Sequence, residues 1–213
     1  MNLQPVHRSD YWEQRYRCGD TRWDKGEPAP GLVDFLATHP ELPRGTVLVP
    51  GCGTGHDVVA WARAGFEVVG LDFAPSAVAR CRQRLTEAGL RAEVYCADFL
   101  RDPPLRQVQW VFEHTLYCAI APSDRPLYVE AVLRWLAADG QLLAIHYLIP
   151  DAGPEPPFGT TRQEVLERFQ PHFELVADWV PRSYPNRVGL ERMFWWRRRL
   201  GGQTVPGGGM TGQ

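Results

Sequence analysis

The chain has 213 residues, of which 44% are hydrophobic and 23% are charged, and its formal net charge at pH 7 is -2. This composition is typical of a soluble globular protein with one substantial domain, and it excludes an intrinsically disordered chain. The slightly acidic balance gives no support to an obligatory nucleic-acid partner, because binding of phosphates needs a basic surface.

The N-terminal part, residues 1–45, is predicted to carry two short helices, over residues 10–18 and 32–38. Trp12 and Tyr16 lie four residues apart, so they share one face of the first helix. A polar stretch rich in glycine and proline separates the two helices. We expect this part to precede a larger domain over residues 46–200.

From residue 46 the pattern alternates between strands and helices. Strands are predicted at residues 47–49, 66–71, 91–96, 109–112, 141–148, 173–180 and 190–197. Helices are predicted at residues 56–64, from Ser76 to residue 88, from Ser123 to before Gly140, and at residues 162–169. Uniformly apolar strands that alternate with helices indicate a mostly parallel sheet with helices on both faces. The glycine-rich tail, residues 201–213, is expected to be disordered.

A glycine loop, Gly51-Cys52-Gly53-Thr54-Gly55, follows the first predicted strand. Its glycines let the backbone turn sharply and approach a ligand closely, and ligands bind at this end of a parallel sheet. A dinucleotide site needs G-x-G-x-x-G, whose third glycine would fall on His56. The spacing here, G-x-G-x-G, looks like the loop that binds S-adenosylmethionine. This difference argues against the alternative of a nicotinamide-dependent oxidoreductase.

Acidic and aromatic residues follow the next two strands. Asp72 ends the second strand, where its carboxylate can accept hydrogen bonds from both ribose hydroxyls of a cofactor. Asp98 follows the third strand and is placed to accept from an adenine amino group. Phe73 and Phe99 are expected to flank the adenine ring.

Glu113 and His114 end the fourth predicted strand, and we expect them beside the transferred methyl group. A structural role for His114 is the alternative. The sequence holds no phosphate loop of the form G-x-x-x-x-G-K-[ST], no H-E-x-x-H and no G-x-S-x-G. Its histidines do not cluster with cysteines or carboxylates, and its five cysteines form no C-x-x-C pair, so no metal site or disulfide framework is expected. With a polar start and no long apolar run, a cytoplasmic location without membrane contact is the expectation.

Four segments of the chain resemble one enzyme family, the thiopurine S-methyltransferases, and within it the plant thiol and halide (thiocyanate) methyltransferases. They are YWEQRYRCGDTRWDKGEPAPGLVDFL, VLVPGCGTGHDVVAWARAGFEVVGLDFAPSAV, EHTLYCAIAPSDRPLYVEAVLRWL and GPEPPF. The resemblance implies a class I S-adenosylmethionine-dependent methyltransferase fold, which is Rossmann-like and has a seven-stranded sheet. It also implies S-adenosylmethionine as methyl donor, S-adenosylhomocysteine as product, a small-molecule acceptor and a monomeric protein.

The resemblance further implies that Trp12, Tyr16 and Trp23 belong to an N-terminal lid over the cofactor. Aromatic faces stabilise a sulfonium cation by cation–π attraction, and a lid excludes water from the methyl donor. Family members have a tryptophan where this chain has Tyr16, and the plant enzymes have a tyrosine where His114 stands. The cofactor contacts carried over from the family fall on Gly51, Asp72, Asp98, Phe99 and His114.

Arg125 matches an arginine implicated in substrate binding in the thiopurine enzymes, and an ion pair at a helix start is its alternative role. Arg125 and His114 are the catalytic candidates. Tyr117, Tyr147 and Phe158 are candidates for the wall of the acceptor pocket. The predicted reaction moves a methyl group to a small soft nucleophile: a thiol, hydrosulfide, thiocyanate or a halide. Thiopurines, selenium or tellurium species, and a cofactor-binding relative without activity are the alternatives.

Overall fold

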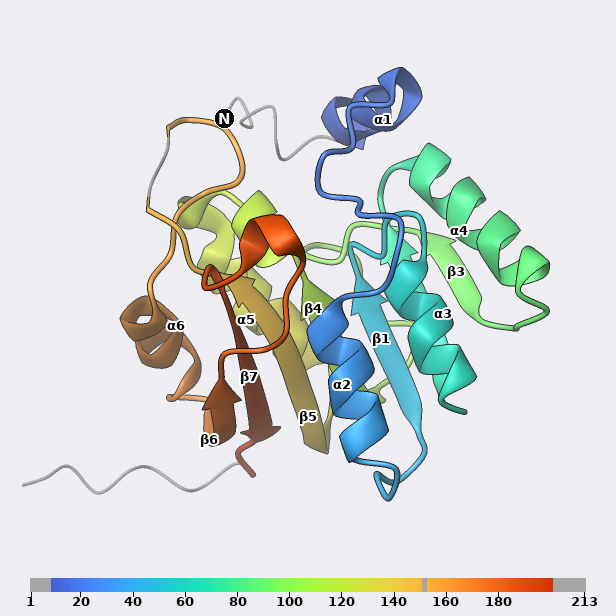
Figure 1. Cartoon of the computed structure of the whole chain (residues 1–213). Helices are drawn as coiled ribbons and strands as arrows, with labels where there is room; N and C mark the ends of the chain where they lie inside the picture. The colour runs from blue at the N-terminus through green and yellow to red at the C-terminus, as the bar shows by residue number, and fades with distance from the viewer. Residues whose placement is uncertain (1–8, 151–152, 201–213) are drawn as a thin grey trace, which may run out of the picture.

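A computed structural model of the chain describes residues 9–150 and 153–200, and Figure 1 shows the arrangement of its elements. The tail over residues 201–213, which the sequence predicts to be disordered, lies outside these ranges. In the part that is described, no helix is long and apolar enough to cross a membrane.

Seven strands form one sheet in the order β3-β2-β1-β4-β5-β7-β6. Their bounds are β1 (Thr46–Pro50), β2 (Glu67–Asp72), β3 (Glu93–Cys96), β4 (Val108–His114), β5 (Leu136–Tyr147), β6 (Phe173–Trp179) and β7 (Glu191–Arg198). The first five strands are parallel, and β7 is antiparallel to both β5 and β6. The predicted seven-stranded, mostly parallel sheet is confirmed.

The helices cover both faces of this sheet, as the sequence predicts. Successive strand side chains point to opposite faces, so Val47 and Val49 pack in one core and Leu48 in the other. The first core includes residues of α2 (Pro30–Thr38), α3 (His56–Arg63) and α4 (Pro75–Glu87). The second includes residues of α5 (Arg125–Trp135) and α6 (Arg162–Phe169). Burial on both faces explains why these strands are uniformly apolar.

Several helix and strand starts differ from the predictions, those of α4, α5 and β5 among them. Helix α4 begins at Pro75 with Ala74 as its N-cap rather than Ser76, and the Ser76 backbone N–H donates to Glu13 at 2.8 Å. Helix α5 begins at Arg125, after the short 3-10 turn η3 (Pro122–Asp124), rather than at Ser123. Strand β5 begins at Leu136, whose pairing with β4 extends the strand past Gly140.

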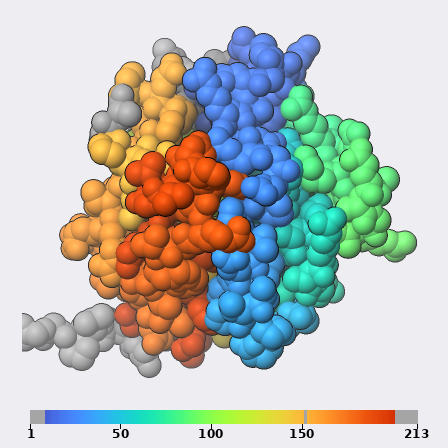
Figure 2. Space-filling view, in the orientation of Figure 1, coloured from blue at the N-terminus to red at the C-terminus, as the bar shows by residue number. Residues whose placement is uncertain are grey.

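The N-terminal segment and the C-terminal hairpin meet on one face of the molecule. Helix α1 (Ser9–Cys18) lies above the carboxyl ends of the strands, beside α4 (Figure 1). The space-filling view shows the segment after α1 side by side with the residues between β6 and β7 (Figure 2). Tyr184 donates to the Glu27 carbonyl oxygen at 2.8 Å across this boundary. The segment after α1 and the connection between β6 and β7 therefore lie against each other on this face of the molecule.

Candidate cofactor and acceptor site

A cavity of about 580 Å³ opens at the carboxyl ends of the strands. Its wall comes from α1 and the segment after it, from the loops that follow β1, β2, β3 and β4, and from the C-terminal hairpin. In open α/β sheets ligands bind at this edge, where connections leave neighbouring strands in opposite directions. Between β1 and β4 the strand order reverses in this way, so the cavity lies where a ligand is expected.

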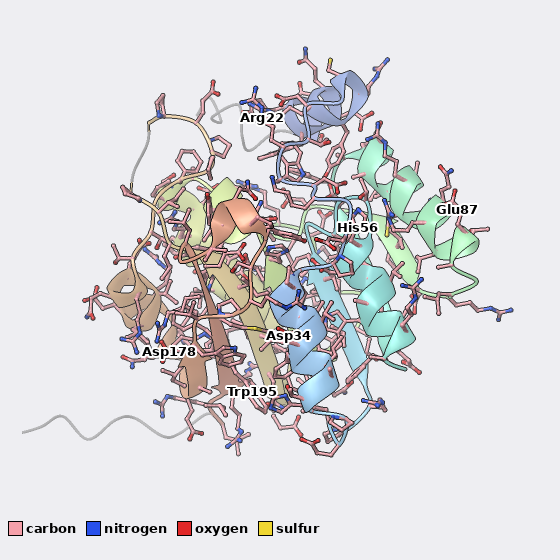
Figure 3. The ribbon with its side chains drawn as sticks, in the orientation of Figure 1. Arg22, Asp34, His56, Glu87, Asp178 and Trp195 are labelled. Carbon is pink, nitrogen blue, oxygen red and sulfur yellow. The ribbon has the colours of Figure 1, made fainter. Side chains whose placement is uncertain are left out.

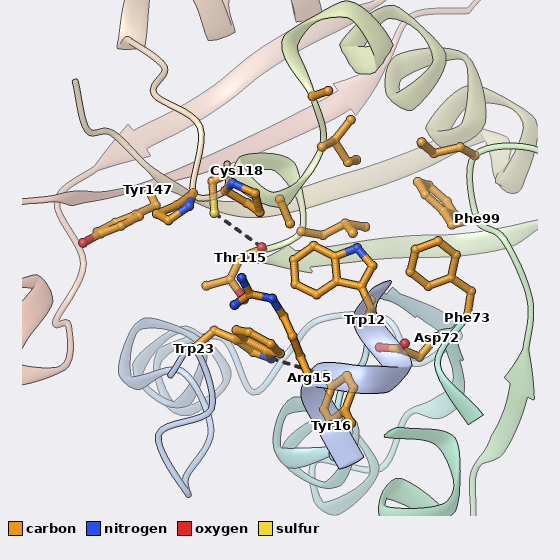
Figure 4. A pocket seen from close by; sticks show the side chains of 18 of the residues that line it. Trp12, Arg15, Tyr16, Trp23, Asp72, Phe73, Phe99, Thr115, Cys118 and Tyr147 are labelled. Carbon is orange, nitrogen blue, oxygen red and sulfur yellow. Dashed lines mark hydrogen bonds between the residues drawn. The ribbon is translucent and has the colours of Figure 1, made fainter. Parts of the chain in front are cut away.

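Nine of the predicted site residues lie on the cavity wall. They are Trp12, Tyr16, Trp23, Gly51, Asp72, Phe73, Asp98, Phe99 and Tyr147. Figure 4 shows Phe73, Phe99 and Asp72 on one side of the cavity, Tyr147 and Cys118 on the other, and Trp12 between them. We call the first side the adenosine end and the second the acceptor end.

The glycine loop and Asp72 form one hydrogen-bonded unit at the adenosine end. Asp72 is 8% exposed, and its carboxylate accepts from the backbone N–H of Gly53 at 3.0 Å and of Ala74 at 2.9 Å. Burial raises the pKa of Asp72 to about 6, although these hydrogen bonds act in the opposite direction. Gly51 has a φ of 61°, and a Cβ there would lie 3.0 Å from a Leu116 side-chain atom. The loop therefore leaves space for a ligand that a side chain would take.

Asp98 lies on the same wall in a second set of polar contacts. Its carboxylate accepts from the Leu100 backbone N–H at 2.9 Å and pairs with Arg101 at 3.1 Å. Arg101 also pairs with Asp124 at 3.2 Å, and all three charged side chains line the cavity. The Asp98 carboxylate, which is predicted to accept a hydrogen bond from an adenine amino group, is thus held in place by its own loop.

Three aromatic residues of the N-terminal segment gather over the cavity. The rings of Trp12 and Trp23 meet edge to face at 5.3 Å, and those of Tyr16 and Trp23 at 5.7 Å. Trp23 Nε1 donates to the Tyr16 hydroxyl at 3.3 Å. The sequence predicts these residues as a lid, and we use that name for residues 9–29.

Polar contacts fix the lid to the helices that follow the glycine loop and β2. Glu13 accepts from the Ser76 hydroxyl at 2.6 Å, at the start of α4. Asp24 accepts from the Thr54 hydroxyl at 2.6 Å and pairs with His56 at 3.0 Å; His56 lies at the start of α3, below Arg22 of the lid (Figure 3). Burial alone would raise the pKa of Asp24, but these hydrogen bonds hold it well below its usual range.

Glu113 and His114 do not lie on the cavity wall, unlike the prediction. Adjacent residues of a strand point to opposite faces, so Glu113 turns into the second core, where it is fully buried and accepts from the Tyr117 backbone N–H at 3.1 Å. Burial raises the pKa of Glu113 to about 7. His114 points the other way and lies between Asp57 and Glu191, behind the wall.

Arg125 also stands behind the wall. It is 1% exposed, and it pairs with Glu164 at 2.8 Å and donates to the Gly159 carbonyl oxygen at 2.8 Å. The alternative of an ion pair at a helix start is therefore what the structure contains. Tyr117 donates to the same Glu164 at 3.3 Å, and Phe158 is buried against Ala121. Cys52, Gly53 and Gly55 are likewise not on the cavity wall, whereas Gly51 of the same loop is.

Sequence reasoning missed one charged residue at the acceptor end. Arg187, in the turn η4 (Pro185–Arg187), lines the cavity, and its guanidinium lies 5.3 Å from the ring of Tyr147. It donates to the Trp23 carbonyl oxygen at 3.3 Å and to Glu191 at 3.1 Å. No local motif marks this arginine, because its partners lie on the lid and on β7.

A comparison with known families settles which family builds this cavity. The model of the family described as "Thiopurine S-methyltransferase (TPMT)" matches residues 7–180. The chain belongs to the thiopurine S-methyltransferase family. Its relatives include a probable thiol methyltransferase 2 of Arabidopsis thaliana, 33% identical over 92% of this chain and 88% of the relative. Thiocyanate methyltransferase 1 of Brassica oleracea is 34% identical over 88% of this chain and 84% of that protein.

Solved structures share the fold of this thiopurine S-methyltransferase family member at low sequence identity. The 1,6-didemethyltoxoflavin-N1-methyltransferase of Burkholderia thailandensis superposes with a TM-score of 0.71 and 18% identity, over 93% of this chain and 92% of that one. The N-methyltransferase NodS of Bradyrhizobium japonicum gives a TM-score of 0.69 and 13% identity, over 92% and 99% of the two chains. The fold is that of class I methyltransferases, and the family member is an S-adenosylmethionine-dependent methyltransferase. The dehydrogenase alternative is set aside.

The residues on the wall suit S-adenosylmethionine. Asp72 and Asp98 supply carboxylate acceptors for hydroxyl and amino groups, and Gly51 leaves room for close approach of a ligand to the backbone. Trp12 and Trp23 supply aromatic faces, which attract a sulfonium cation. Direct contact between the cofactor and each of these residues stays a prediction.

Proposed function

We propose that this enzyme transfers the methyl group of S-adenosylmethionine to a small, soft and anionic nucleophile: thiocyanate, a halide, hydrosulfide or a thiolate. One observation carries the choice of acceptor, which is the separation of charge along the cavity. The adenosine end has three acids and one base, namely Asp72, Asp98, Asp124 and Arg101. The rest of the charged wall has four bases and two acids, namely Arg15, Arg22, Lys25, Arg187, Asp20 and Glu155.

Ion pairs on the wall leave this second group with an excess of positive charge. Arg15 pairs with Asp20 at 3.0 Å and with Glu155 at 3.8 Å, and Arg22 pairs with the same Asp20 at 3.2 Å. Lys25 donates to a backbone carbonyl oxygen at 2.6 Å, so no carboxylate neutralises it in that contact. A part of the wall with an excess of positive charge attracts anionic ligands.

The residues of the chain hold and align the reactants in this scheme. The cofactor, when bound, supplies a methyl group already activated by the sulfonium, so alignment and exclusion of water can provide most of the catalysis. The lid covers the cavity from above, and its aromatic rings exclude water. An anionic acceptor needs no general base, and a thiol with a pKa of about 8.5 gains from basic neighbours that stabilise its thiolate.

The volume of the cavity fits the same proposal. The cavity, about 580 Å³ in volume, has to hold the donor and the acceptor together, which favours a small acceptor. We propose that the enzyme acts as a monomer on a freely diffusing small molecule.

A headspace assay for volatile methylated products tests the proposal. Iodide, thiocyanate, hydrosulfide, an aromatic thiol and a thiopurine are supplied in parallel with S-adenosylmethionine. We expect turnover of the inorganic anions with kcat/KM above that of the thiopurine, and a loss of at least tenfold in kcat/KM for thiocyanate in Lys25→Gln, by the loss of a positive charge. Turnover of a thiopurine, or of a selenium or tellurium species, without turnover of the anions would overturn the choice of acceptor.

A further inference from the structure

Four charged side chains form a cluster behind the acceptor end. It consists of Asp57 from α3, His114 from β4, Arg187 from η4 and Glu191 from β7. Their side chains are between 2% and 16% exposed. Only Arg187 lies on the cavity wall. The charge of the other three still acts on the cavity through Arg187, because interactions between buried charges are weakly screened.

His114 lies between the two carboxylates of the cluster. Its Nδ1 is 3.3 Å from Asp57 and its Nε2 is 3.4 Å from Glu191. An imidazolium donates to both carboxylates, whereas a neutral imidazole with its hydrogen on Nδ1 donates only to Asp57 and accepts from Arg187 at Nε2. Burial alone would lower the pKa of His114, but the two carboxylates raise it to about 9.

The groups around His114 define its electrostatic environment from every side. Arg187 Nη1 lies 3.2 Å from the imidazole Nε2 and donates to the same Glu191 oxygen at 3.1 Å. Tyr184 stacks on the imidazole with ring centroids 6.0 Å apart, and burial raises the pKa of its hydroxyl. Glu113, next to His114 on β4, faces the second core. Asp57 also accepts from the Ala29 backbone N–H at 2.8 Å, which ties the end of the lid to the cluster.

The charges of the cluster cancel only while His114 carries a proton. Two carboxylates then face two cations, and Arg187 presents its positive charge to the acceptor end. When His114 is neutral, the cluster has a net charge of one negative, directly behind the wall that the acceptor contacts. We propose that His114 is a specificity-determining residue whose positive charge offsets the second buried carboxylate and so lets the cavity accept anions.

This inference rests on the anionic acceptor of the proposed function, so its test uses binding as well as turnover. Thiocyanate, whose charge is constant between pH 6 and 10, is titrated calorimetrically into the protein saturated with S-adenosylhomocysteine. We expect His114→Gln to weaken thiocyanate binding about tenfold at pH 7.5, the effect of one added negative charge at short range. Affinity for the cationic S-adenosylmethionine should not fall, whereas a distorted cavity would weaken both ligands.

A double variant separates charge from shape. His114→Gln/Glu191→Gln removes one positive and one negative charge, so the cluster is neutral again, and we expect thiocyanate affinity to return to within about threefold of wild type. If the double variant binds thiocyanate no better than His114→Gln, His114 acts through shape and the inference is wrong. His172→Gln, which removes an exposed histidine from the loop before β6, serves as the control and should bind thiocyanate like wild type.

The pH dependence of the wild type tests the same idea without a substitution. Thiocyanate affinity should fall as the pH rises through about 9, the pKa of His114. This step should be absent in the double variant, whereas an effect of the cofactor's own amino group would remain there. The imidazole resonances of His114 should titrate in the same range by NMR. An imidazole that titrates below pH 7 would overturn the inference even if the variants do not fold.

Failure of this inference can be told apart from failure of the proposed function. Turnover of thiocyanate with equal KM in wild type and His114→Gln would leave the function standing and remove the role of His114. Binding of thiocyanate that depends on His114, with no turnover of any anion, would do the reverse. Neither binding nor turnover of thiocyanate by the wild type would overturn both.

Discussion

The Asp72 carboxylate accepts a hydrogen bond of 3.0 Å from the backbone N–H of Gly53, so the acid that ends β2 and the loop that follows β1 are one unit. A second bond, from the Ala74 N–H, fixes the other carboxylate oxygen. The acid therefore shapes the adenosine end before any ligand arrives. Its protonation affects both the loop and the ligand.

Cofactor binding should depend on the ionisation of Asp72. Burial raises the pKa of this carboxyl to about 6, and only the ionised form accepts hydrogen bonds with both oxygens. Affinity for S-adenosylhomocysteine should therefore rise as the pH increases from 5 to 7. Asp72→Asn should bind at least tenfold more weakly at pH 7.5 and lose this step, because one acceptor becomes a donor. Calorimetric titration across this range measures both effects, and a flat wild-type profile would contradict the assignment.

Gly55 should matter mainly for the stability of the fold, and Gly51 mainly for cofactor binding. An alanine at Gly55 would place its Cβ 2.5 Å from Cys81 Sγ at a φ of 88°, so Gly55→Ala should destabilise the fold by about 2 kcal/mol or more. Gly51→Ala has a φ of 61° to strain it as well, but its Cβ meets a flexible Leu116 side chain at 3.0 Å, and Gly51 lies on the cavity wall. It should therefore lower the melting temperature less than Gly55→Ala does, and it should weaken the binding of S-adenosylhomocysteine. Thermal unfolding with and without S-adenosylhomocysteine separates the two, and equal behaviour would count against the distinction.

Arg125 should matter for stability more than for the acceptor. Arg125→Met leaves Glu164 without its buried partner and two carbonyl oxygens without a donor, which should cost about 3 kcal/mol of unfolding free energy. Urea unfolding measures this cost. Arg162 lies on the same helix as Glu164 and forms a surface ion pair with Asp178. Arg162→Gln breaks this pair and should lower the unfolding free energy by less than about 1 kcal/mol. Unchanged stability together with a raised acceptor KM would instead favour the substrate-binding role that the family resemblance implies.

The buried residues Glu113 and His146 should give opposite dependences of the unfolding free energy on pH, which offset each other in the wild type. Glu113 has its pKa raised from 4.5 to about 7 by burial, so its contribution is complete below pH 4.5 and is lost as the pH rises to 7. His146 has its pKa lowered from 6.5 to about 3, mainly by burial, so its contribution is complete above pH 6.5 and is lost as the pH falls. Between these limits the two slopes oppose each other.

Substitution of one partner should expose the slope of the other. His146→Phe should lose about 2 kcal/mol of unfolding free energy between pH 5 and 6.5, at about 1.4 kcal/mol per pH unit. Glu113→Gln should gain stability with rising pH over the same range. Chemical denaturation at several pH values measures both slopes. Parallel curves for wild type and both variants would show that neither group has a perturbed pKa.

The sequence predicts the elements of this fold well because they follow from local rules. Three features can be interpreted without knowledge of the packing: the apolar run from Val47 to Val49, the spacing of the loop glycines and the carboxylate of Asp72. Gly140 shows where local rules stop: its sequence predicts a break, but β5 runs through it, with a shift of register against β4 between Leu136 and Gln141.

Side-chain direction is what the sequence could not provide. The sequence predicts Glu113 and His114 together beside the methyl group, yet strand alternation directs one into a core and the other to a charge cluster. Arg125 resembles a ligand-binding arginine, but the phase of α5 turns it toward Glu164. Arg187 acquires its place only when η4 meets the lid, and no local pattern records a contact between residues 164 positions apart.

The meeting of the lid with the C-terminal hairpin has a consequence for the order in which activity develops during refolding. Its contacts join Arg182 to Asp34, Tyr184 to Glu27 and Arg187 to Trp23, across sequence separations of 148 to 164 residues. Closing loops of this length costs more chain entropy than pairing neighbouring strands. Helical and strand content should therefore recover before enzymatic turnover, and a refolding chain should pass through a state that has its sheet but cannot yet retain a methyl acceptor.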